Sequence, residues 1–392
     1  MSMASKLPRK VALAAGGTGG HIFPAQALAR ELLSRGVGVA LVTDARGGGF
    51  GGDLAEVETF RISAGAMAGA GIVKKLRSIA SLSLGYLQAR GHLRRCAAEV
   101  VVGFGGYPSV PTVMAGAHLG LRVVLHEQNS VLGRANRLLA GRAQVIATCF
   151  DKVEGVAPGD RAKLRLTGNP VREAVATLAQ RSYAQSGPDG RLHLLVVGGS
   201  QGARVFNEVV PAAVARLPED LRRRLTVHQQ VPGNAEQSVA QTYDACGVTH
   251  HLAAFFTDVP ERLAGAQLVI SRAGASTVAE LAAAGRPAIM VPYPSATDDH
   301  QTSNAQALVE AGGGWLMPQS NLDAANLSER LGSLLGNPAV LIRAAGCAKA
   351  AAHLNAARDL ADLVCGSANG NGQSGNRRAR DGDAQRGKEA AA

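Results

Sequence analysis

The chain has 392 residues, of which 46% are hydrophobic and 18% are charged. This length suffices for two domains with separate cores, and the composition excludes a chain that is disordered throughout. The formal net charge of +11 favours an anionic partner such as nucleic acid, a phosphorylated ligand or an anionic membrane, although a basic protein without a special partner has the same charge.

In the first half of the chain, short apolar runs alternate with segments of helical period. This alternation is typical of a parallel sheet covered by helices. Strands are predicted at Val11–Ala15, Gly38–Thr43, Val100–Gly103, Arg122–His126 and Val145–Thr148. Helices are predicted at Phe23–Arg35, Ile72–Arg95, Ser109–Leu119 and Val131–Ala140.

The pattern is interrupted near residues 168–170 and 181–190 and then starts again. Strands are predicted at His193–Val197, Leu225–Gln230, Leu268–Ile270 and Ala288–Val291, with helices at Ala203–Leu217, Ser276–Ala284, Ser303–Ala311 and about Pro338–Cys365. The sequence therefore predicts two doubly wound α/β domains. Residues 366–392 cannot bury a core and are expected to be disordered; their mixed charge argues against nucleic-acid binding.

Two further features limit the class of protein. Five cysteines lie far apart without a CxxC pair, which fits neither a zinc site nor a disulfide framework and favours a reducing compartment. No apolar run approaches the length of a membrane span, so we expect a soluble protein or one that sits on a membrane without crossing it.

Glycine-rich loops follow predicted strands at Gly16–Gly20, Gly105-Gly106 and Gly198–Gly202. Missing side chains let the backbone approach a ligand, and the N–H groups at the start of the next helix favour an anion. The dinucleotide fingerprint is incomplete because Ile22 stands where its third glycine is needed, and no GxxxxGK[ST] loop occurs. One such loop can be a mere turn, but three indicate a ligand site between the domains.

The segment 271–280 is the most informative part of the second half. Its small hydroxyl residues are expected to cap a helix that begins near Ser276, whose N–H groups can hold a pyrophosphate. Glu280 follows one turn later and can either reach two ribose hydroxyls or cap the helix start. In the run Asp298–Gln301, carboxylates at consecutive positions diverge, so recognition of sugar hydroxyls is preferred to metal binding.

Together these motifs resemble the MurG-type family of N-acetylglucosaminyltransferases, over about residues 10–365. The matching motifs, in order, are Gly16–His21 with Phe23-Pro24, Gly105–Tyr107, His126–Asn129, Gly168–Arg172, Gly198–Ala203, Arg272–Glu280 and Asp298–Gln301. The resemblance implies a GT-B fold, in which two doubly wound domains face each other across a cleft. It assigns residues 7–168 to an acceptor- and membrane-facing domain and 169–345 to a UDP-sugar domain, with the last helix, 346–365, packed back on the first.

The activity implied by the resemblance is transfer of N-acetylglucosamine from UDP-N-acetylglucosamine to undecaprenyl-pyrophosphoryl-N-acetylmuramoyl pentapeptide, with inversion. The implied place is the cytoplasmic face of the bacterial inner membrane, with cell-wall synthesis proteins as further partners. Neither a metal nor another cofactor is expected. Some related sequences differ at residues 273–277 and 297–301, which leaves the ribose carboxylate in place but obscures which side chain touches which sugar atom.

Site residues follow from the same resemblance. Glu280 would hold the ribose, Phe256 the uracil environment and Gln301 the sugar hydroxyls. The full set of implied donor contacts is Thr18, Gly19, Gly20, Asn129, Arg172, Ser200, Phe256, Ala275, Ser276, Thr277, Val278, Ala279, Glu280 and Gln301. The implied acceptor contacts are Gly105, Gly106, Tyr107, His126 and Glu127.

The acceptor hydroxyl needs a general base, and His21 is the first candidate. It stands at the cleft end of the first glycine loop, and imidazole titrates near neutrality. Helix capping and phosphate binding are its alternative roles, and His126 and Glu127 are the reserve candidates for the base.

A basic segment precedes Glu99. Between Glu58 and Glu99 there is no acidic residue, whereas Lys74, Lys75 and Arg77 begin an amphipathic helical pattern. Such a helix can rest on anionic lipid or pack on the sheet; the implied lipid-borne acceptor favours the first. The segment lacks interleaved aromatic residues, which argues against nucleic-acid binding. The remaining alternatives are a UDP-N-acetylglucosamine 2-epimerase, a transferase with another acceptor, and a non-catalytic nucleotide-sugar-binding protein.

Overall fold

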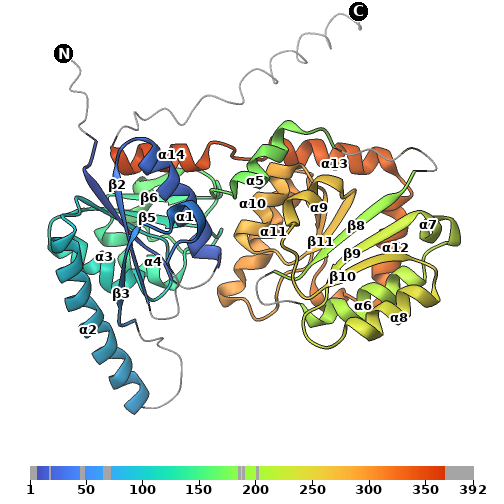
Figure 1. Cartoon of the computed structure of the whole chain (residues 1–392), viewed down its shortest axis with the longest axis horizontal. Helices are drawn as coiled ribbons and strands as arrows, with labels where there is room; N and C mark the ends of the chain where they lie inside the picture. Colours follow the sequence, from blue (N-terminus) through green and yellow to red (C-terminus); the bar gives the residue numbers. More distant parts are fainter. Residues whose placement is uncertain are drawn as a thin grey trace, which may run out of the picture.

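The computed structural model describes residues 7–16, 19–44, 49–64, 72–183, 187, 190–199 and 203–366. These residues form two domains, each built on one parallel sheet with helices on both faces (Figure 1). The predicted pair of doubly wound α/β domains is therefore confirmed.

The first domain contains a seven-stranded parallel sheet of order β3-β2-β1-β4-β5-β6-β7. Its strands are β1 (Lys10–Ala14), β2 (Gly38–Asp44), β3 (Glu58–Ile62), β4 (Val100–Gly103), β5 (Arg122–Glu127), β6 (Val145–Thr148) and β7 (Leu164–Leu166). Its main helices are α1 (Gly19–Ser34), α2 (Ile72–Arg95), α3 (Ser109–His118) and α4 (Arg134–Leu139). Alternate strand residues enter two cores: Val11 and Leu13 pack with α1, and Ala12 packs with α2 and α3. Continuous apolar strands suit a sheet buried on both faces.

The second domain contains a six-stranded parallel sheet of order β10-β9-β8-β11-β12-β13. Its strands are β8 (Leu192–Val197), β9 (Leu225–Gln230), β10 (Thr249–Ala253), β11 (Leu268–Ser271), β12 (Ala288–Met290) and β13 (Gly314–Leu316). Its helices are α5 (Glu173–Ala176), α6 (Arg204–Ala215), α7 (Glu219–Arg224), α8 (Glu236–Ala245), α9 (Val259–Gly265), α10 (Ala275–Ala284), α11 (His300–Glu310), α12 (Ala324–Leu335) and α13 (Pro338–Ala350). One face packs on α6, α8 and α12, and the other on α9, α10 and α11.

The end of the chain crosses between the domains. The sequence predicts one helical run over about 338–365, with 346–365 on the first domain, but the structure divides this run at residues 351–355 into α13 and α14 (Ala356–Cys365). Helix α13 packs in the second domain through Leu341 and Ala348, whereas α14 packs in the first through Leu360 and Val364. Only the later part of the expected helix therefore lies on the first domain.

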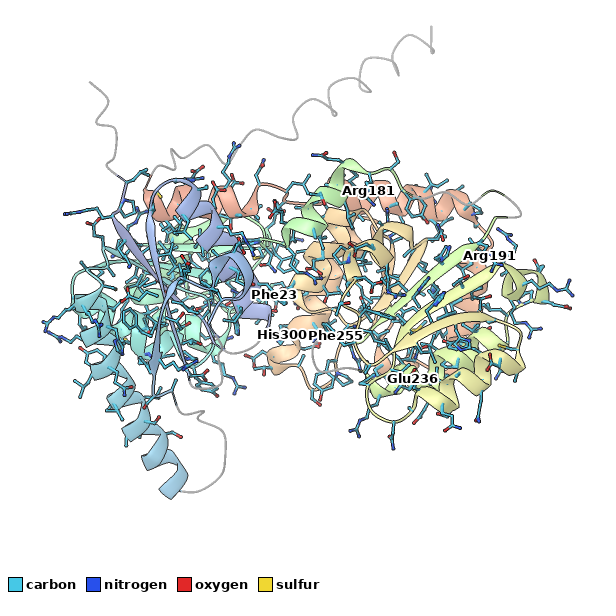
Figure 2. All side chains as sticks on the ribbon, in the orientation of Figure 1. Phe23, Arg181, Arg191, Glu236, Phe255 and His300 are labelled. Atoms are coloured by element: carbon cyan, nitrogen blue, oxygen red, sulfur yellow. The ribbon has the colours of Figure 1, made fainter. Side chains whose placement is uncertain are left out.

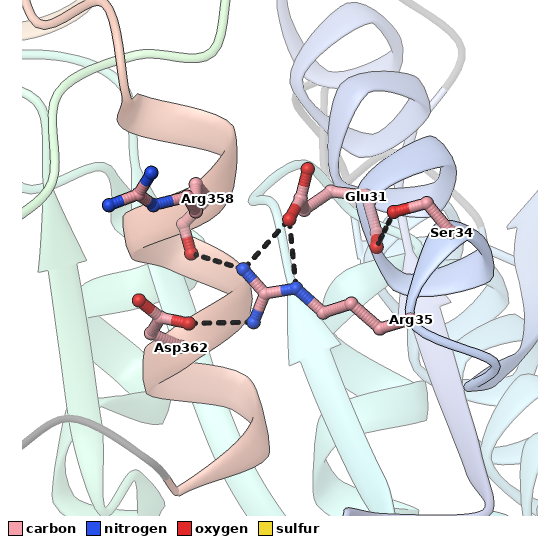
Figure 3. A network of polar contacts seen from close by, with 5 residues as sticks. All are labelled: Glu31, Ser34, Arg35, Arg358 and Asp362. Atoms are coloured by element: carbon pink, nitrogen blue, oxygen red, sulfur yellow. Dashed lines mark hydrogen bonds and ion pairs between the residues drawn. The ribbon is translucent and has the colours of Figure 1, made fainter.

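Arg35, which directly follows α1, ties α14 to the first domain (Figure 3). Arg35 donates to Asp362 at 2.6 Å and to the carbonyl of Arg358 at 3.2 Å, and its Nε donates to Glu31 at 2.8 Å. These bonds lie beside the apolar contacts of Leu360, so the returning helix is held by both packing and charge.

Helix α2 has 24 residues and projects from the first domain, at the lower left of Figure 1. Three of its apolar side chains are largely exposed: Ile79 at 57%, Leu84 at 49% and Leu87 at 64%. Within the described part of the chain, no single helix has the length and apolarity to span a membrane. Helices α12 and α13 meet these two criteria only when they are counted together, and the pair is bent by 90°.

Candidate active site

Loops from both domains meet through Asn304, a fully buried residue of α11. Its Oδ1 accepts from the backbone N–H and the hydroxyl of Ser130, at 2.9 and 3.0 Å. Its Nδ2 donates at 3.1 Å to both Asn129 Oδ1 and the Ala273 carbonyl. Asn129 and Ser130 follow β5, and Ala273 follows β11, so the carboxyl ends of both sheets face the same interface. Doubly wound folds bind ligands at such strand ends.

A cleft of about 1710 Å³ lies between the two domains. Its walls include Ser130 and Asn169 on one side and Ala275, Val278 and Ala279 of α10 on the other. Figure 2 shows Phe23 of the first domain and His300 of the second at the sides of the domains that face each other. Three of the α10 residues predicted to contact the donor thus line this cleft, whereas Ser276, Thr277 and Glu280 are not among its lining residues.

His21 lies in the first turn of α1 and packs against Gly105 and Gly106. A Cβ on Gly105 would be 3.3 Å from His21 Cε1, and one on Gly106 would be 3.4 Å from His21 Cδ2. Both glycines have positive φ, 84° and 75°, which side chains rarely adopt. The imidazole and the predicted acceptor loop therefore belong to one local site, beside Tyr107, which is 38% exposed.

The imidazole of His21 is partly buried, and one of its nitrogens has a hydrogen-bond partner among the residues that the structure describes. Its Nδ1 lies 3.2 Å from Oε1 of Gln128. Burial lowers the pKa of His21, and the nearby Glu127 carboxylate and the Gln128 oxygen oppose this effect. The lowered pKa favours an uncharged imidazole at neutral pH, the state that a base requires.

His126 and Glu127 lie deeper than the sequence predicts. His126 is fully buried and Glu127 is 2% exposed. Glu127 accepts from the backbone N–H groups of Asn129 and Gly133 and from the side chain of Asn136, at 3.0, 2.8 and 2.8 Å. Burial lowers the pKa of His126 to about 4. The predicted direct acceptor contacts and the reserve base role of both residues do not fit this burial; their bonds hold the 128–133 loop instead.

Glu280 and Arg172 form an ion pair with two hydrogen bonds. Nε and Nη2 of Arg172 lie 2.7 and 2.8 Å from the two carboxylate oxygens. The guanidinium also lies 5.7 Å from the ring centroid of Phe23, across the interface. These bonds raise the pKa of Arg172. Two predicted donor contacts, 108 residues apart in sequence, are therefore in direct contact.

The start of α10 differs from the prediction. Gly274 is the N-cap, the helix begins at Ala275, and no side chain in the described ranges caps it, so the expected cap by a hydroxyl or by Glu280 is wrong. Ser276 and Thr277 lie inside the first turn, where Ser276 Oγ is 3.5 Å from Asn169 Nδ2. Backbone N–H groups of a first turn lack partners in their own helix and favour an anion.

The aromatic residues after β10 also differ from the prediction. Phe256 is only 3% exposed, and the guanidinium of Arg262 lies 4.0 Å from its ring centroid. The preceding Phe255 is 69% exposed, so Phe255, and not Phe256, has an accessible ring after β10. Sequence alone gave no reason to choose between adjacent phenylalanines.

Gln301 joins two loops of the second domain. Its Oε1 accepts from the backbone N–H groups of Ala273 and Tyr293, at 3.2 and 2.9 Å. The nearby carboxylate of Asp298 instead faces the first domain, where it lies 3.6 Å from Arg134 and 3.5 Å from Arg137. Among the residues that the structure describes, no group of three His, Cys, Asp or Glu side chains could hold a metal.

The structure says little about the role of several predicted site residues. Gly19 and Gly20 open α1, and a Cβ on Gly20 would meet nothing within 4 Å. Thr18 and Ser200 lie outside the described residues, as does the predicted tail from residue 367 onward. The sequence did not single out Gln128, which lies in the motif His126–Asn129, or Asn304, which lies in the predicted helix Ser303–Ala311. Their importance is visible only in the structure, where both side-chain amides are buried.

Both domains match models of one enzyme family. Residues 11–148 match the glycosyltransferase family 28 N-terminal domain, and residues 193–364 match the glycosyltransferase family 28 C-terminal domain. A relative from Paramagnetospirillum magneticum is 54% identical over 91% of this chain and 96% of its own length. One from Rhodospirillum centenum is 56% identical over 93% and 96%. Both are named UDP-N-acetylglucosamine–N-acetylmuramyl-(pentapeptide) pyrophosphoryl-undecaprenol N-acetylglucosamine transferase.

Solved structures agree with this assignment. The crystal structure of Acinetobacter baumannii MurG matches with a TM-score of 0.73 and 29% identity, over 91% of this chain and 99% of that one. A UDP-GlcNAc 2-epimerase from Neisseria meningitidis matches with a TM-score of 0.60 over 90% and 98%, but its 12% identity shows the fold alone. The MurG-type resemblance and the GT-B arrangement are thus confirmed, and the chain belongs to glycosyltransferase family 28.

Proposed function

We propose that this chain transfers N-acetylglucosamine from UDP-N-acetylglucosamine to undecaprenyl-pyrophosphoryl-N-acetylmuramoyl pentapeptide, inverting the anomeric carbon. The observation that carries the proposal is the name of this reaction on relatives that are 54–56% identical over more than nine tenths of the chain. The loops of both domains around Asn304 and the cleft beside α10 support it, because such a transfer needs two substrates in one crevice.

In this proposal, the donor lies against the second domain. The first-turn N–H groups of α10 take the diphosphate, and their fixed dipoles stabilise the charge that develops on the leaving UDP without a metal. Glu280 accepts from the ribose hydroxyls while Arg172 orients its carboxylate. Phe255 or the backbone of Phe256 borders the uracil, and Gln301 supports the loops around the sugar.

His21 is the proposed general base. The acceptor hydroxyl gives its proton to the imidazole as its oxygen attacks the anomeric carbon, and UDP leaves from the opposite face. The position beside Gly105 and Gly106 supports this role, because those glycines leave room for the acceptor. Proton transfer of this kind contributes about 10²–10⁴-fold to rate.

The first domain is proposed to rest on the cytoplasmic face of the inner membrane. The exposed Ile79, Leu84 and Leu87 of α2, on a helix whose sequence carries basic and no acidic residues, support contact with anionic lipid. A lipid-linked acceptor would then reach the crevice without leaving the bilayer.

The product of one incubation separates this function from its rivals. Purified protein is mixed with sugar-labelled UDP-N-acetylglucosamine and the lipid-linked muramoyl acceptor. Label in the lipid fraction supports the proposal, epimerised free donor supports an epimerase, and unchanged donor with both substrates bound supports a non-catalytic protein.

A further inference from the structure

The orientation of the Gln128 side-chain amide is fixed by acceptors. Its Nε2 lies 3.0 Å from the carbonyl oxygen of Phe104, 3.3 Å from that of His126 and 2.9 Å from His126 Nδ1. Carbonyl oxygens only accept hydrogen bonds, so the amide nitrogen must face them. The amide oxygen therefore points the other way, toward His21.

This orientation determines which nitrogen of His21 carries the proton. The Gln128 oxygen lies 3.2 Å from His21 Nδ1, and because an amide oxygen can only accept, the bond requires a proton on Nδ1. In a neutral imidazole the other nitrogen then has a free lone pair. We propose that Gln128 is a positioning residue that holds His21 in the Nδ1–H tautomer and so makes Nε2 the atom that accepts the substrate proton. This inference rests on the proposed base role of His21.

The bonds beyond Gln128 run in the same direction. Because His126 Nδ1 accepts from Gln128, the proton of His126 is on Nε2, which lies 3.4 Å from the Cys149 sulfur. His126 is fully buried and Cys149 is 6% exposed. Every donor in the series, from His21 through Gln128 to His126, thus points toward the interior, which leaves the lone pair at the outer end.

The glycine loop keeps the outer end free. A Cβ on Gly106 would lie 3.6 Å from His21 Nε2, so a side chain at that position would crowd the nitrogen that the proposal assigns to the reaction. The loop and the amide therefore act on opposite sides of the ring: Gln128 fixes Nδ1, and Gly106 leaves space at Nε2.

The test combines nitrogen NMR of the ¹⁵N-histidine-labelled full chain with kinetics. The His21 signals are identified by their loss in His21→Gln. In the unmodified chain we expect Nδ1 protonated and Nε2 bare. Gln128→Leu, which removes the accepting oxygen, should populate the Nε2–H tautomer and lower kcat by about 10²-fold or more, with donor KM changed by less than about threefold.

Gln229→Leu is the matched control. Gln229 is buried as Gln128 is, donates to the Phe206 carbonyl at 3.1 Å and accepts from Tyr243 at 2.6 Å, but it lies in the second domain. This control should leave the His21 signals unchanged. A second variant, Gln128→Glu, keeps an oxygen beside Nδ1, and its other oxygen faces the carbonyl oxygens of Phe104 and His126, so the new side chain must stay protonated there. The tautomer should then persist, and turnover should be retained.

The possible failures are distinguishable. An Nε2–H tautomer in the unmodified chain overturns the inference, and this spectrum decides even where Gln128→Leu does not fold. An unchanged tautomer and full turnover in folded Gln128→Leu overturn it as well. Near-normal turnover in His21→Gln would instead overturn the proposed base, whatever the tautomer.

Discussion

Arg172 holds the carboxylate of Glu280 with two hydrogen bonds, of 2.7 and 2.8 Å. Arg172 belongs to the segment that joins the two sheets, and Glu280 belongs to α10. A carboxylate has about four acceptor sites, so Glu280 can keep the arginine and still accept from two ribose hydroxyls. In the proposed function, the pair thus presents an oriented, charged acceptor to the donor.

Glu280→Gln should therefore weaken donor binding more than it slows the chemical step. The amide keeps one acceptor oxygen but loses the charge, and hydrogen bonds to charged groups are worth about 1.5–3 kcal/mol, or about 10- to 100-fold in affinity. We expect donor KM to rise by that factor with kcat reduced less. Glu261→Gln, in the first turn of α9, is the control. An unchanged donor KM in Glu280→Gln would remove the ribose role.

Asn304→Ala should destabilise the protein and loosen the arrangement of its domains. The substitution leaves four partner groups, on Asn129, Ser130 and Ala273, without their amide, at a cost of about 1–3 kcal/mol each where water cannot replace it. Urea unfolding should show a lower free energy of unfolding, and steady-state kinetics a higher KM for both substrates. The exposed Asn326→Ala serves as control. Wild-type stability and kinetics in Asn304→Ala would show that this amide does not join the domains.

Much of this fold can be predicted from local sequence patterns, whereas the pairings between side chains cannot. The strands beside Gly16, Gly105 and Gly198 were predicted because they are apolar and followed by glycine, and parallel strands bring their carboxyl ends to one edge. Strands β3, β7, β10 and β13 were missed, since these strands are short or rich in polar and charged residues. The predicted strand ends at His126, yet β5 extends through Glu127, and both side chains are buried. No local pattern gives the direction of a side chain, so the contact of Arg172 with Glu280 could not be predicted.

Stability should fall as the pH falls below neutrality. In the unfolded chain a histidine takes up its proton near pH 6.5, whereas burial lowers the pKa of His126 in the folded chain to about 4. Between these values the unfolded state binds more protons, so acid favours unfolding, by about 3 kcal/mol over the whole interval. Urea unfolding at pH 7 and pH 4.5 measures the loss. His126→Gln should make the dependence less steep; an equally steep curve in that variant would show that His126 is not its source.

Neutralising the start of α2 should weaken binding to anionic vesicles. Each basic residue near such a surface contributes about 1 kcal/mol, so Lys74→Gln, Lys75→Gln and Arg77→Gln together should lower the partition coefficient by about 100-fold. Vesicle sedimentation measures it. The control replaces Arg216, Arg330 and Arg343, three exposed arginines of the second domain, by glutamine, with the same change in charge. Equal losses in both triple variants would contradict a membrane surface on α2.

In the proposed function, backbone N–H groups at the start of α10 hold the donor diphosphate without a cation, while the Arg172–Glu280 pair holds the ribose. The most direct measurement is the initial rate of sugar transfer in excess chelator, with and without added magnesium. Equal rates are expected in both. A rate that falls by about 10²-fold or more in chelator and returns with the metal would contradict it, because the amide groups would then not suffice to stabilise the departing UDP.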